Sequence, residues 1–447
     1  MLDFLFVYEH AQRELESIVL LGAKLKQLGY SVEYIQIPVS EAELPAKYFN
    51  NVRCVFAPCL YSDHELYICV YRIAGKAHYV VNLQWEQLLT KERDEDMASF
   101  WFPKEHAKSA FHICWGEHTK YNLIRAGVPE QNALVTGAVQ LDVLSREFDS
   151  YYMTKNDLFE KFKINMTDKT ILFISSFSAV NLDEYTYNHM CEVLGKDTYD
   201  EFVEISTKSQ EKIVEWLLKL CSAGYTVIYR PHPNEALSKL VEDAKANDNF
   251  LVIGEYSAKQ WVRCVDYVYT WISTTYVECT KLNIPCGVLR PYELAPNKDM
   301  CIFGGVEFID SYEALLQTLK SPAHDNRERI SRYVLVDEKP AYQKVIESVL
   351  ELINQKKRFA WPEELTKPMD IKKKAENGSR RRIRLLFFIH KCLKAVGLNK
   401  LPVFRRINAK YDNNVKILEN YRKKRFDPLS DVIGEIEQKY IDIIHSS

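Results

Sequence analysis

The stretch TVIYRPHPNE, Thr226 to Glu235, carries a short apolar segment into Arg-Pro-His-Pro near the middle of the 447-residue chain. Its first four residues predict a buried strand, which would deliver Arg230 to the carboxyl edge of a sheet. The two prolines fix φ at about −65° and disfavour helix in the residues before them, so the direction of His232 is restricted. The segment therefore predicts an α/β sheet with polar side chains at one edge.

The polar side chains after this strand suit a phosphate or pyrophosphate. Arginine and histidine N–H groups can both donate to phosphate oxygens. A helix that begins at Pro233 or Asn234, with Glu235 in its first turn, would add unpaired backbone N–H groups and the positive end of the helix dipole. The alternative is an ordinary turn in which His232 caps a neighbouring carbonyl.

The rest of the chain repeats the alternation of strand and helix. A first series begins with the strand DFLFVY and the helix ELESIVLLGAKLKQLG. A second series contains the strand segments TILFISS, YTVIYRPHP and VDYVYTWIS. Buried strands separated by helices of about 10–15 residues predict parallel sheets. We predict an N-terminal Rossmann-like domain over residues 1–150, a C-terminal one over 151–355, and a basic linker with a helical tail over 356–447. Ligands of such sheets bind in the cleft at the carboxyl ends of the strands.

Composition indicates an ordinary soluble globular protein, with 47% hydrophobic and 27% charged residues. The 11 cysteines are scattered singly, so we expect reduced thiols in a cytoplasmic protein rather than a disulfide framework or a zinc site. No HExxH, GxGxxG or GxxxxGK[ST] pattern is present, which argues against zincins, dinucleotide oxidoreductases and P-loop enzymes. No signal peptide or membrane span is predicted.

Two further strand ends carry hydroxyl groups. Ser273, Thr274 and Thr275 lie between the strand VDYVY and a helix, where they can cap the helix or bind a phosphate. Glu278, one turn into that helix, could accept hydrogen bonds from both hydroxyls of a ribose. Ser175 and Ser176 follow the strand TILFI and have the same two interpretations. A helix cap with a first-turn acid is the plainer alternative.

The order of these motifs resembles that of bacterial surface-carbohydrate glycosyltransferases. YRPHPNE, then a strand, then Ser/Thr and a helix with Glu, is similar to the nucleotide-binding half of capsule and lipopolysaccharide biosynthesis proteins. Kdo transferases, bacterial sialyltransferases and CDP-glycerol glycerophosphotransferases share this pattern. YEHAQRELESIVLLGAKLKQLGYSV and CWGEHTKYNLIRAGVPEQNALVTGAVQLDVL resemble segments of the N-terminal half, so the resemblance covers about residues 1–350.

The resemblance implies a GT-B fold, with the donor nucleotide in the C-terminal domain and the acceptor in the N-terminal one. From their places at strand ends, we assign Arg230, Pro233, Glu235, Ser273, Thr274, Thr275, Ser175 and Ser176 to the donor site. The resemblance adds that His232 would contact donor phosphate and that Glu278 would hold the ribose. It also favours a cytidine nucleotide. The implied activity is transfer of a sugar to a growing, lipid-linked surface polysaccharide.

The catalytic carboxylate is less clearly indicated. The family's acidic-acidic-Gly motif corresponds to VVNLQWEQLL, in which only Glu86 matches and the glycine is absent. Glu86 is our first candidate for the base, or for a nucleophile in a retaining enzyme, with Glu9 and Asp142 next. The Asp-x-Asp at Asp94–Asp96 lies in a charged stretch that we interpret as solvated surface. We therefore expect no bound metal and no cofactor beyond the nucleotide-activated donor.

The C-terminal segment differs in charge. Residues 356–425 hold 22 Lys or Arg against 6 Asp or Glu. RRRIRLLFFIHKCLKAVG combines this charge with bulky apolar residues, so residues 372–406 could lie on the anionic inner face of the cell membrane. The alternative is a helix that packs on the catalytic domains. Nucleic-acid binding lacks a recognisable module.

Three alternative functions stay open on the sequence alone: a CDP-glycerol-type glycerophosphotransferase, a nucleotide-sugar epimerase, and a non-catalytic assembly subunit that kept the fold. The altered QWEQ motif is the feature that keeps the last one open.

Overall fold

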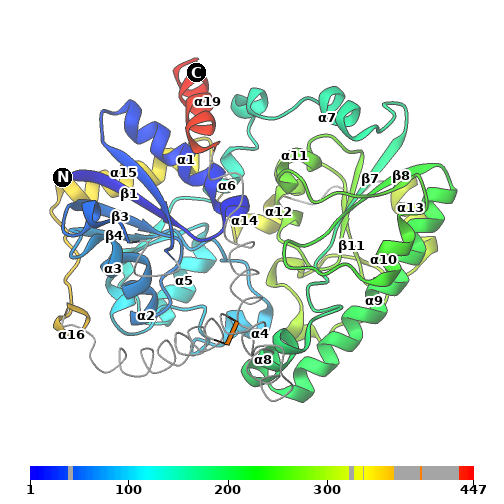
Figure 1. Cartoon of the computed structure of the whole chain (residues 1–447), viewed down its shortest axis with the longest axis horizontal. Coiled ribbons are helices and arrows are strands. Elements are labelled where there is room, and N and C mark those ends of the chain that lie inside the picture. Colours follow the sequence, from blue (N-terminus) through cyan, green and yellow to red (C-terminus); the bar gives the residue numbers. More distant parts are fainter. Residues whose placement is uncertain (39–43, 322–326, 336, 367–392, 395–431, 447) are drawn as a thin grey trace.

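The protein forms two α/β lobes, each built around a six-stranded sheet in which all strands are parallel (Figure 1). The computed structural model describes residues 1–38, 44–321, 327–335, 337–366, 393–394 and 432–446. The prediction of two parallel α/β sheets in tandem is confirmed.

The first sheet has the strand order β2-β1-β3-β4-β5-β6. Its strands are β1 Leu2–Tyr8, β2 Val32–Gln36, β3 Val52–Ala57, β4 Tyr79–Asn82, β5 Phe111–Cys114 and β6 Ala133–Val135. The helices of this lobe are α1 Ala11–Gln27, α2 Asp63–Glu65, α3 Arg72–Ala74, α4 Lys91–Glu95, α5 Glu117–Arg125 and α6 Val139–Asp142, with a π-helix at Leu66–Tyr71.

The second sheet has the order β12-β11-β10-β7-β8-β9, so the chain reverses direction across the sheet between β7 and β10. Its strands are β7 Lys169–Ile174, β8 Tyr225–Arg230, β9 Phe250–Val252, β10 Tyr267–Thr270, β11 Cys286–Leu289 and β12 Phe308–Ile309. The accompanying helices are α7 Lys155–Phe162, α8 Glu184–Leu194, α9 Lys196–Ser222, α10 Lys239–Ala244, α11 Ala258–Val262, α12 Thr275–Leu282, α13 Tyr312–Lys320 and α14 Arg327–Ser331.

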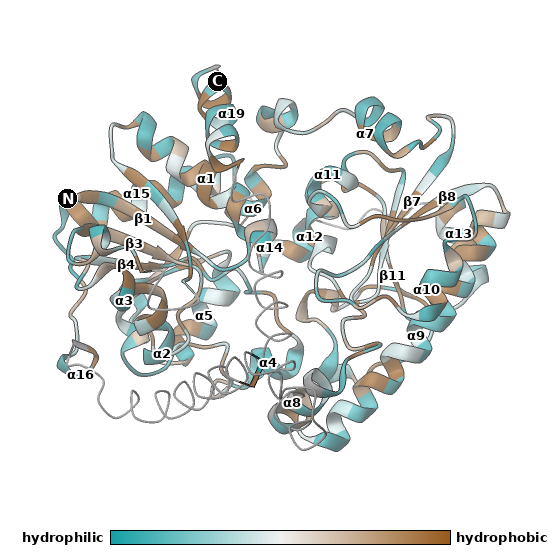
Figure 2. Ribbon diagram, viewed as in Figure 1, coloured by the Kyte–Doolittle hydropathy of each residue, from teal (hydrophilic) through white to brown (hydrophobic). Residues whose placement is uncertain are grey.

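Both sheets are covered by helices on two faces, which explains why their strands read as continuous apolar runs (Figure 2). In β1, every residue from Phe4 to Val7 is fully buried. In β8, the same holds for Val227, Ile228 and Tyr229. The apolar stretch that precedes Arg230 is therefore a central strand, paired with β7 on one side and β9 on the other.

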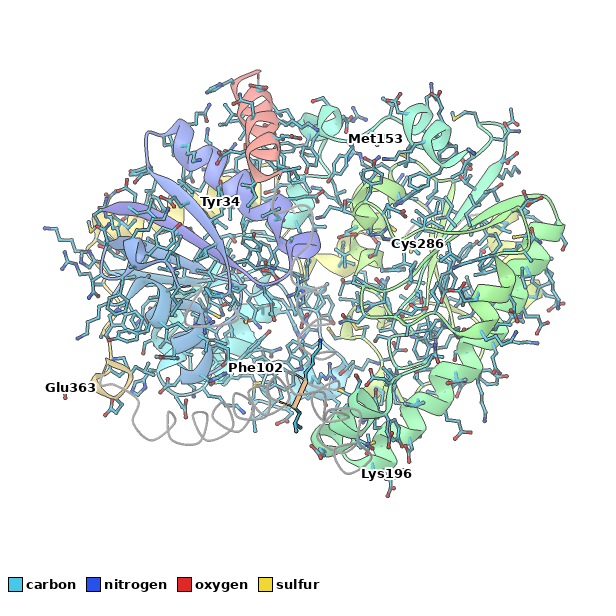
Figure 3. The ribbon with its side chains drawn as sticks, in the orientation of Figure 1. Tyr34, Phe102, Met153, Lys196, Cys286 and Glu363 are labelled. Atoms are coloured by element: carbon cyan, nitrogen blue, oxygen red, sulfur yellow. The ribbon has the colours of Figure 1, made fainter. Side chains whose placement is uncertain are left out.

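The last helices of the chain return to the first lobe. Helix α15, Ala341–Asn354, lies within the range predicted for the second domain, yet its apolar face belongs to the core around α1. Helix α19, Ile433–Ser446, packs beside α1 (Figure 1). The hydroxyl of Tyr34, a residue labelled in Figure 3, donates to Glu437 of α19 at 2.7 Å. The fully buried Tyr440 stacks on Tyr151 at 4.7 Å between ring centroids. The short helix α16, Glu363–Thr366, covers the first lobe as well.

Backbone hydrogen bonds join the two lobes. Thr90 and Met300 form an antiparallel bridge, and the N–H of Lys91 donates to the carbonyl of Asp299 at 2.9 Å. These bonds fix the segment after β4 against the segment after β11, so the two sheet edges are held at a defined separation.

Among the described residues, no helix is both long and apolar enough to cross a membrane.

Candidate functional site

A cavity of about 580 Å³ lies between the lobes and is lined by segments that follow strands of both sheets. In the second lobe, the lining loops follow β7 and β10, the two strands between which the strand order reverses, and the neighbouring β8. The carboxyl edge at such a reversal is where open α/β sheets bind ligands. The lining residues predicted from the sequence are Glu86, Ser175, Ser176, Arg230, His232, Pro233, Ser273, Thr274, Thr275 and Glu278.

The loop after β8 is held by a half-buried carboxylate. Glu235 does not line the cavity; its side chain turns back and accepts from the Tyr229 hydroxyl at 2.6 Å, from the Ser175 hydroxyl at 2.5 Å and from the backbone N–H of His232 at 3.0 Å. Gln210 of α9 donates to the same carboxylate at 3.3 Å. Glu235 thus positions the His232 backbone from behind the cavity wall.

These bonds overturn the prediction that a helix begins at Pro233 or Asn234. Helix α10 begins only at Lys239, where the Ser238 hydroxyl accepts from the Val241 N–H at 3.4 Å. Residues 231–235 form a turn, closed by the Glu235 N–H on the carbonyl of His232 at 2.8 Å. The sequence predicted a helix here because Glu235 stands where an acid of a first helical turn would stand. In the structure this carboxylate instead accepts hydrogen bonds from the Ser175 and Tyr229 hydroxyls.

His232 presents a defined tautomer. Its Nδ1 accepts from the backbone N–H of Asn234 at 3.1 Å, so the proton of the neutral imidazole is on Nε2. The half-buried ring lines the cavity, where an Nε2–H group is a suitable donor for a phosphate oxygen.

Arg230 places a buried positive charge at the same edge. Its guanidinium donates to the carbonyl of Glu255 at 2.9 Å and to that of Tyr256, and burial lowers its pKa to about 10. Its hydrogen-bond partners are carbonyl oxygens, and among the described residues Arg230 forms no salt bridge, although the charges of Glu255 and Glu278 favour its protonated form. Arg230 therefore supplies an electrostatic attraction for an anion in the cavity and also holds the loop after β9.

The two loops at the reversal of the sheet are joined by hydroxyl groups. Ser176 accepts from the backbone N–H of Ile272 at 3.0 Å, which ties the loop after β7 to the loop after β10. Ser273 accepts from the Thr275 N–H at 3.2 Å at the start of α12. The hydroxyls thus serve the structural role that was the alternative to phosphate binding, while the first turn of α12 still opens on the cavity.

Glu278 and Lys259 form the floor between these loops and the first lobe. Burial raises the pKa of Glu278, and its Oε2 atom is buried without a hydrogen-bond partner in the part of the chain that is described. Lys259 of α11 lines the cavity and pairs with Glu16 of α1 at 3.1 Å. Burial favours a lower pKa for Lys259, but Glu16 and Glu278 outweigh this effect and leave the pKa raised. An acceptor-only carboxylate with an unused oxygen suits a pair of ligand hydroxyls.

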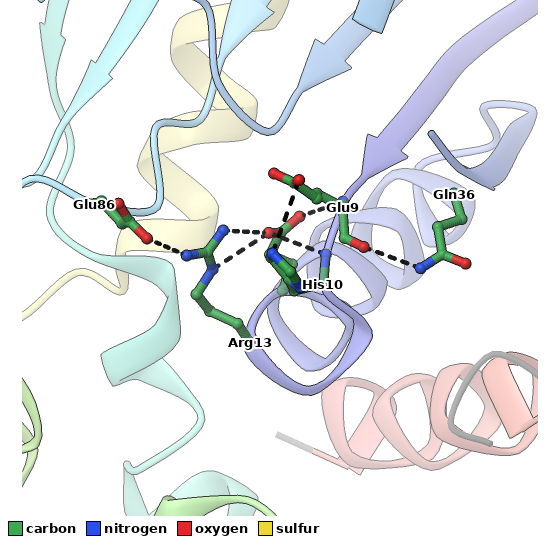
Figure 4. A network of polar contacts seen from close by, with 6 residues as sticks. Glu9, His10, Arg13, Gln36 and Glu86 are labelled. Carbon is green, nitrogen blue, oxygen red and sulfur yellow. Dashed lines mark hydrogen bonds and ion pairs between the residues drawn. The ribbon is translucent and has the colours of Figure 1, made fainter. Parts of the chain in front are cut away.

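The wall formed by the first lobe is centred on Glu86. Arg13 in the first turn of α1 bonds to Glu86 and to the buried Glu14 (Figure 4). Glu14 also accepts from the backbone N–H groups of Glu9 and His10, at 2.8 and 3.3 Å, and so fixes the end of β1. The Glu9 side chain does not line the cavity but contributes to the raised pKa of Arg13.

Gln87, which follows Glu86 in the QWEQ segment, has a structural role. Its amide donates to the carbonyl of Ile113 at 2.8 Å and accepts from the Trp115 N–H at 2.8 Å. The side chain thereby ties the segment after β4 to the end of β5, and Trp85, Glu86 and Gln87 all line the cavity.

Asp142 lies outside this cavity. It accepts from the backbone N–H of Tyr342 at 2.6 Å, at the first turn of α15. Burial raises its pKa to about 7. Its position supports the return of α15 to the first lobe rather than chemistry in the cleft.

The interpretation of Asp94–Asp96 as solvated surface is wrong for Asp94. This side chain is 13% exposed and accepts from His118 at 2.8 Å and from Asn122 at 2.9 Å. The charged composition around it concealed that α4 packs on α5.

The chain is similar to solved structures along most of its length. No family model matches the chain, and no curated protein matches it. A structure of the wall teichoic acid polymerase TagF soaked with CDPG matches at 12% identity with a TM-score of 0.51, over 79% of this chain and 89% of the other. UDP-GlcNAc 2-epimerase from Neisseria meningitidis, bound to UDP-GlcNAc, matches at 15% identity with a TM-score of 0.46, over 78% of this chain and 100% of the other.

The fold is GT-B. In GT-B terms, the cavity is the cleft between two Rossmann-like lobes, and the helices α15 and α19 return from the end of the chain to the first lobe.

Three charged residues of the GT-B cleft were missed from the sequence: Arg13, Arg93 and Lys259. Arg13 follows β1 by a few residues, at the start of α1, and could have been found by the same rule that found Arg230. Lys259 follows β9, a strand of three residues that is too short to give a clear pattern. Arg93 was hidden by the charged stretch around it.

Proposed function

We propose that this protein is a glycosyltransferase that takes a sugar from a nucleotide-activated donor and gives it to a glycan or glycolipid acceptor. The observation that carries the proposal is the arrangement of the cavity. Arg230, His232 and the start of α12 form one wall, and Glu86 lies in the opposite wall. One wall suits an anionic leaving group, and the other suits proton removal from an acceptor.

In the proposed reaction, the oxygen of an acceptor hydroxyl bonds to the anomeric carbon of the donor, and Glu86 accepts the proton of that hydroxyl. The bond between that carbon and the phosphate oxygen breaks, and its electron pair stays on the nucleotide phosphate. Arg230 and the Nε2–H group of His232 stabilise this charge. Glu278, whose Oε2 atom is without a partner among the described residues, accepts from the ribose hydroxyls.

The test is stabilisation by nucleotides. CMP, CDP, UDP, GDP and ADP are added to wild type and to the His232→Ala variant, and the melting temperature is measured. A ligand that binds only the folded state raises this temperature. We expect one base to stabilise wild type, cytidine being the first candidate from the sequence resemblance, and the variant to lose most of this effect.

A matched control is His64→Ala, which removes an exposed histidine of α2 away from the cavity. It should respond to nucleotides as wild type does. An equal response of His232→Ala and wild type would reject the assignment of His232 to donor phosphate.

The pathway and location are proposed from the sequence. We propose that the protein serves capsule or lipopolysaccharide synthesis at the inner face of the cell membrane, held there by residues 372–406. All but residues 393 and 394 of this segment lie outside the described part of the chain. Because α19 packs on α1, the test should neutralise arginines in the segment rather than truncate the chain. Such variants should sediment less with anionic vesicles and respond to nucleotides like wild type; unchanged sedimentation would reject the membrane role.

A further inference from the structure

The cavity wall of the first lobe contains a positive charge that the proposed reaction does not use. Arg93, in α4, lines the cavity and is half-buried. Within the described ranges, its guanidinium has neither a carboxylate at ion-pair distance nor a hydrogen-bond acceptor. Burial lowers its pKa, as expected for a guanidinium that has lost water without gaining a partner.

The acids near Arg93 are bound elsewhere. Glu92 pairs with Lys298 across the lobes, and Asp94 accepts from His118 and Asn122. Glu86, the carboxylate that most favours the charge on Arg93, pairs with Arg13 instead. The neighbouring acids are thus paired with other groups, and Arg93 has no ion pair within the described part of the chain.

Arg93 also contacts an aromatic ring of the cavity wall. Its guanidinium carbon lies 5.4 Å from the ring centroid of Trp101, another residue of the cavity wall. A cation–π contact with the indole restrains the guanidinium, and the N–H groups of a guanidinium can bind two oxygens of a carboxylate or phosphate. The Trp101 indole nitrogen is buried and likewise has no acceptor among the residues described. Two adjacent residues thus offer donors that the protein itself does not satisfy.

The charged side chains that line the cavity also favour an anion near Arg93. Its lining side chains include four cationic groups, Arg13, Arg93, Arg230 and Lys259, against two carboxylates, Glu86 and Glu278. Arg13 pairs with both Glu14 and Glu86, Lys259 pairs with Glu16, and Arg230 is assigned to the donor phosphate. Arg93 is the remaining cation, and it belongs to the other lobe.

We propose that Arg93, stacked on Trp101, binds a second anionic group, a phosphate or carboxylate, that is separate from the donor phosphates and is carried by the acceptor or by the transferred sugar. The inference rests on the proposed function, because it assigns the substrate class of the same cleft. It states that one reactant besides the nucleotide is an anion.

The first test needs no natural substrate. Inorganic phosphate is titrated into the full chain carrying His232→Ala, which weakens the donor phosphate site, and into the same chain with Arg93→Gln added. Thermal stabilisation by phosphate should require about tenfold or more phosphate in the second protein, since a hydrogen bond to a charged group is lost. Arg125→Gln, which removes a guanidinium stacked on Tyr121 outside the cavity, is the matched control and should change nothing. Equal phosphate titrations with and without Arg93 would overturn the proposal.

A second readout separates a binding role from a structural one. Because Arg93 is an unpaired charge in a partly buried position, Arg93→Gln should melt at the same or a higher temperature than wild type without ligand. A residue whose role is structural would lower the melting temperature when replaced. A clear loss of stability in the unliganded variant would count against the proposal.

Two further arms identify the source of the anion. If the transferred sugar carries it, Arg93→Gln should reduce stabilisation by UDP-glucuronate more than by UDP-glucose, or by CMP-sialic acid more than by CMP. If the acceptor carries it, the variant saturated with nucleotide should lose affinity for glycerol 3-phosphate. An equal effect of Arg93→Gln on all of these ligands would overturn the proposal. If nucleotide binding depends on His232 but phosphate binding is unchanged by Arg93→Gln, only this inference is rejected. The proposed function is then left intact.

Discussion

Lys259 of α11 and Glu16 of α1 form an ion pair of 3.1 Å that joins the two lobes at the cavity wall. Their side chains are 6% and 13% exposed, so the pair is largely shielded from water. Glu16 also accepts from the Ser257 hydroxyl at 3.3 Å, at the start of α11. Through these two contacts Glu16 holds the start of α11 against α1.

We predict that Glu16→Gln lowers the free energy of unfolding by about 3 kcal/mol, because Lys259 is left buried without its partner. The measurement is urea unfolding at neutral pH. The double variant Glu16→Gln/Lys259→Met should recover much of the loss, since it removes the orphaned charge. If the double variant were as unstable as the sum of both single ones, the pair would not be the source of the effect.

Glu235 should affect nucleotide binding without touching the nucleotide. Its replacement by Ala removes the acceptor of the Tyr229 hydroxyl, the Ser175 hydroxyl and the His232 N–H. We expect a loss of about 1–3 kcal/mol in stability together with weaker stabilisation by the nucleotide that the panel identifies. Glu242→Ala, an exposed acid of α10, is the control and should change neither quantity. Normal nucleotide binding by Glu235→Ala would show that the turn at His232 holds without it.

The sequence predicted the sheets better than it predicted the loops. Apolar runs bounded by glycine, proline and polar residues identify buried strands, because a strand covered on both faces has few other compositions. Strand ends then place Arg230, Ser176 and Thr275 at one edge, and the structure confirms that they share a cavity. The direction of a loop side chain depends instead on partners distant in sequence. Glu235 binds Ser175, and Asp142 binds the backbone of Tyr342; no local pattern records either contact.

Glu278 offers a test of sugar recognition in the nucleotide. Its unpartnered Oε2 predicts a preference for ribonucleotides over 2′-deoxyribonucleotides. In Glu278→Gln, one oxygen acceptor is replaced by a donor, so this preference should shrink by about tenfold, while the unliganded protein should be as stable as wild type or more so, because burial disfavours the carboxylate. Calorimetric titration with the matched pair of nucleotides measures the ratio. An unchanged ratio would place the ribose elsewhere in the cleft.

Asp142 predicts a pH effect on stability. Its pKa is raised to about 7 in the folded protein, against about 4 in an unfolded chain, so the folded state holds the proton more tightly. Its contribution to stability is therefore present below pH 4, falls as pH rises from 4 to 7, and is lost above that. Asp142→Asn cannot titrate, so its stability relative to wild type should increase by about 2–4 kcal/mol between pH 4 and pH 8. If the difference in the free energy of unfolding between the two proteins stayed constant from pH 4 to pH 8, the raised pKa of Asp142 would be contradicted.

Glu86 should separate binding from turnover. It lies in the wall opposite His232, and Arg13 and Glu14 fix its position, so Glu86→Gln should bind the nucleotide as wild type does. If Glu86 removes the acceptor proton, transfer should fall by about 100-fold or more, because an amide cannot act as a base. The measurement is release of nucleotide from the donor identified by the panel, with Glu92→Gln as a control for a nearby acid that pairs with Lys298. A variant with both normal binding and normal transfer would exclude Glu86 as the base.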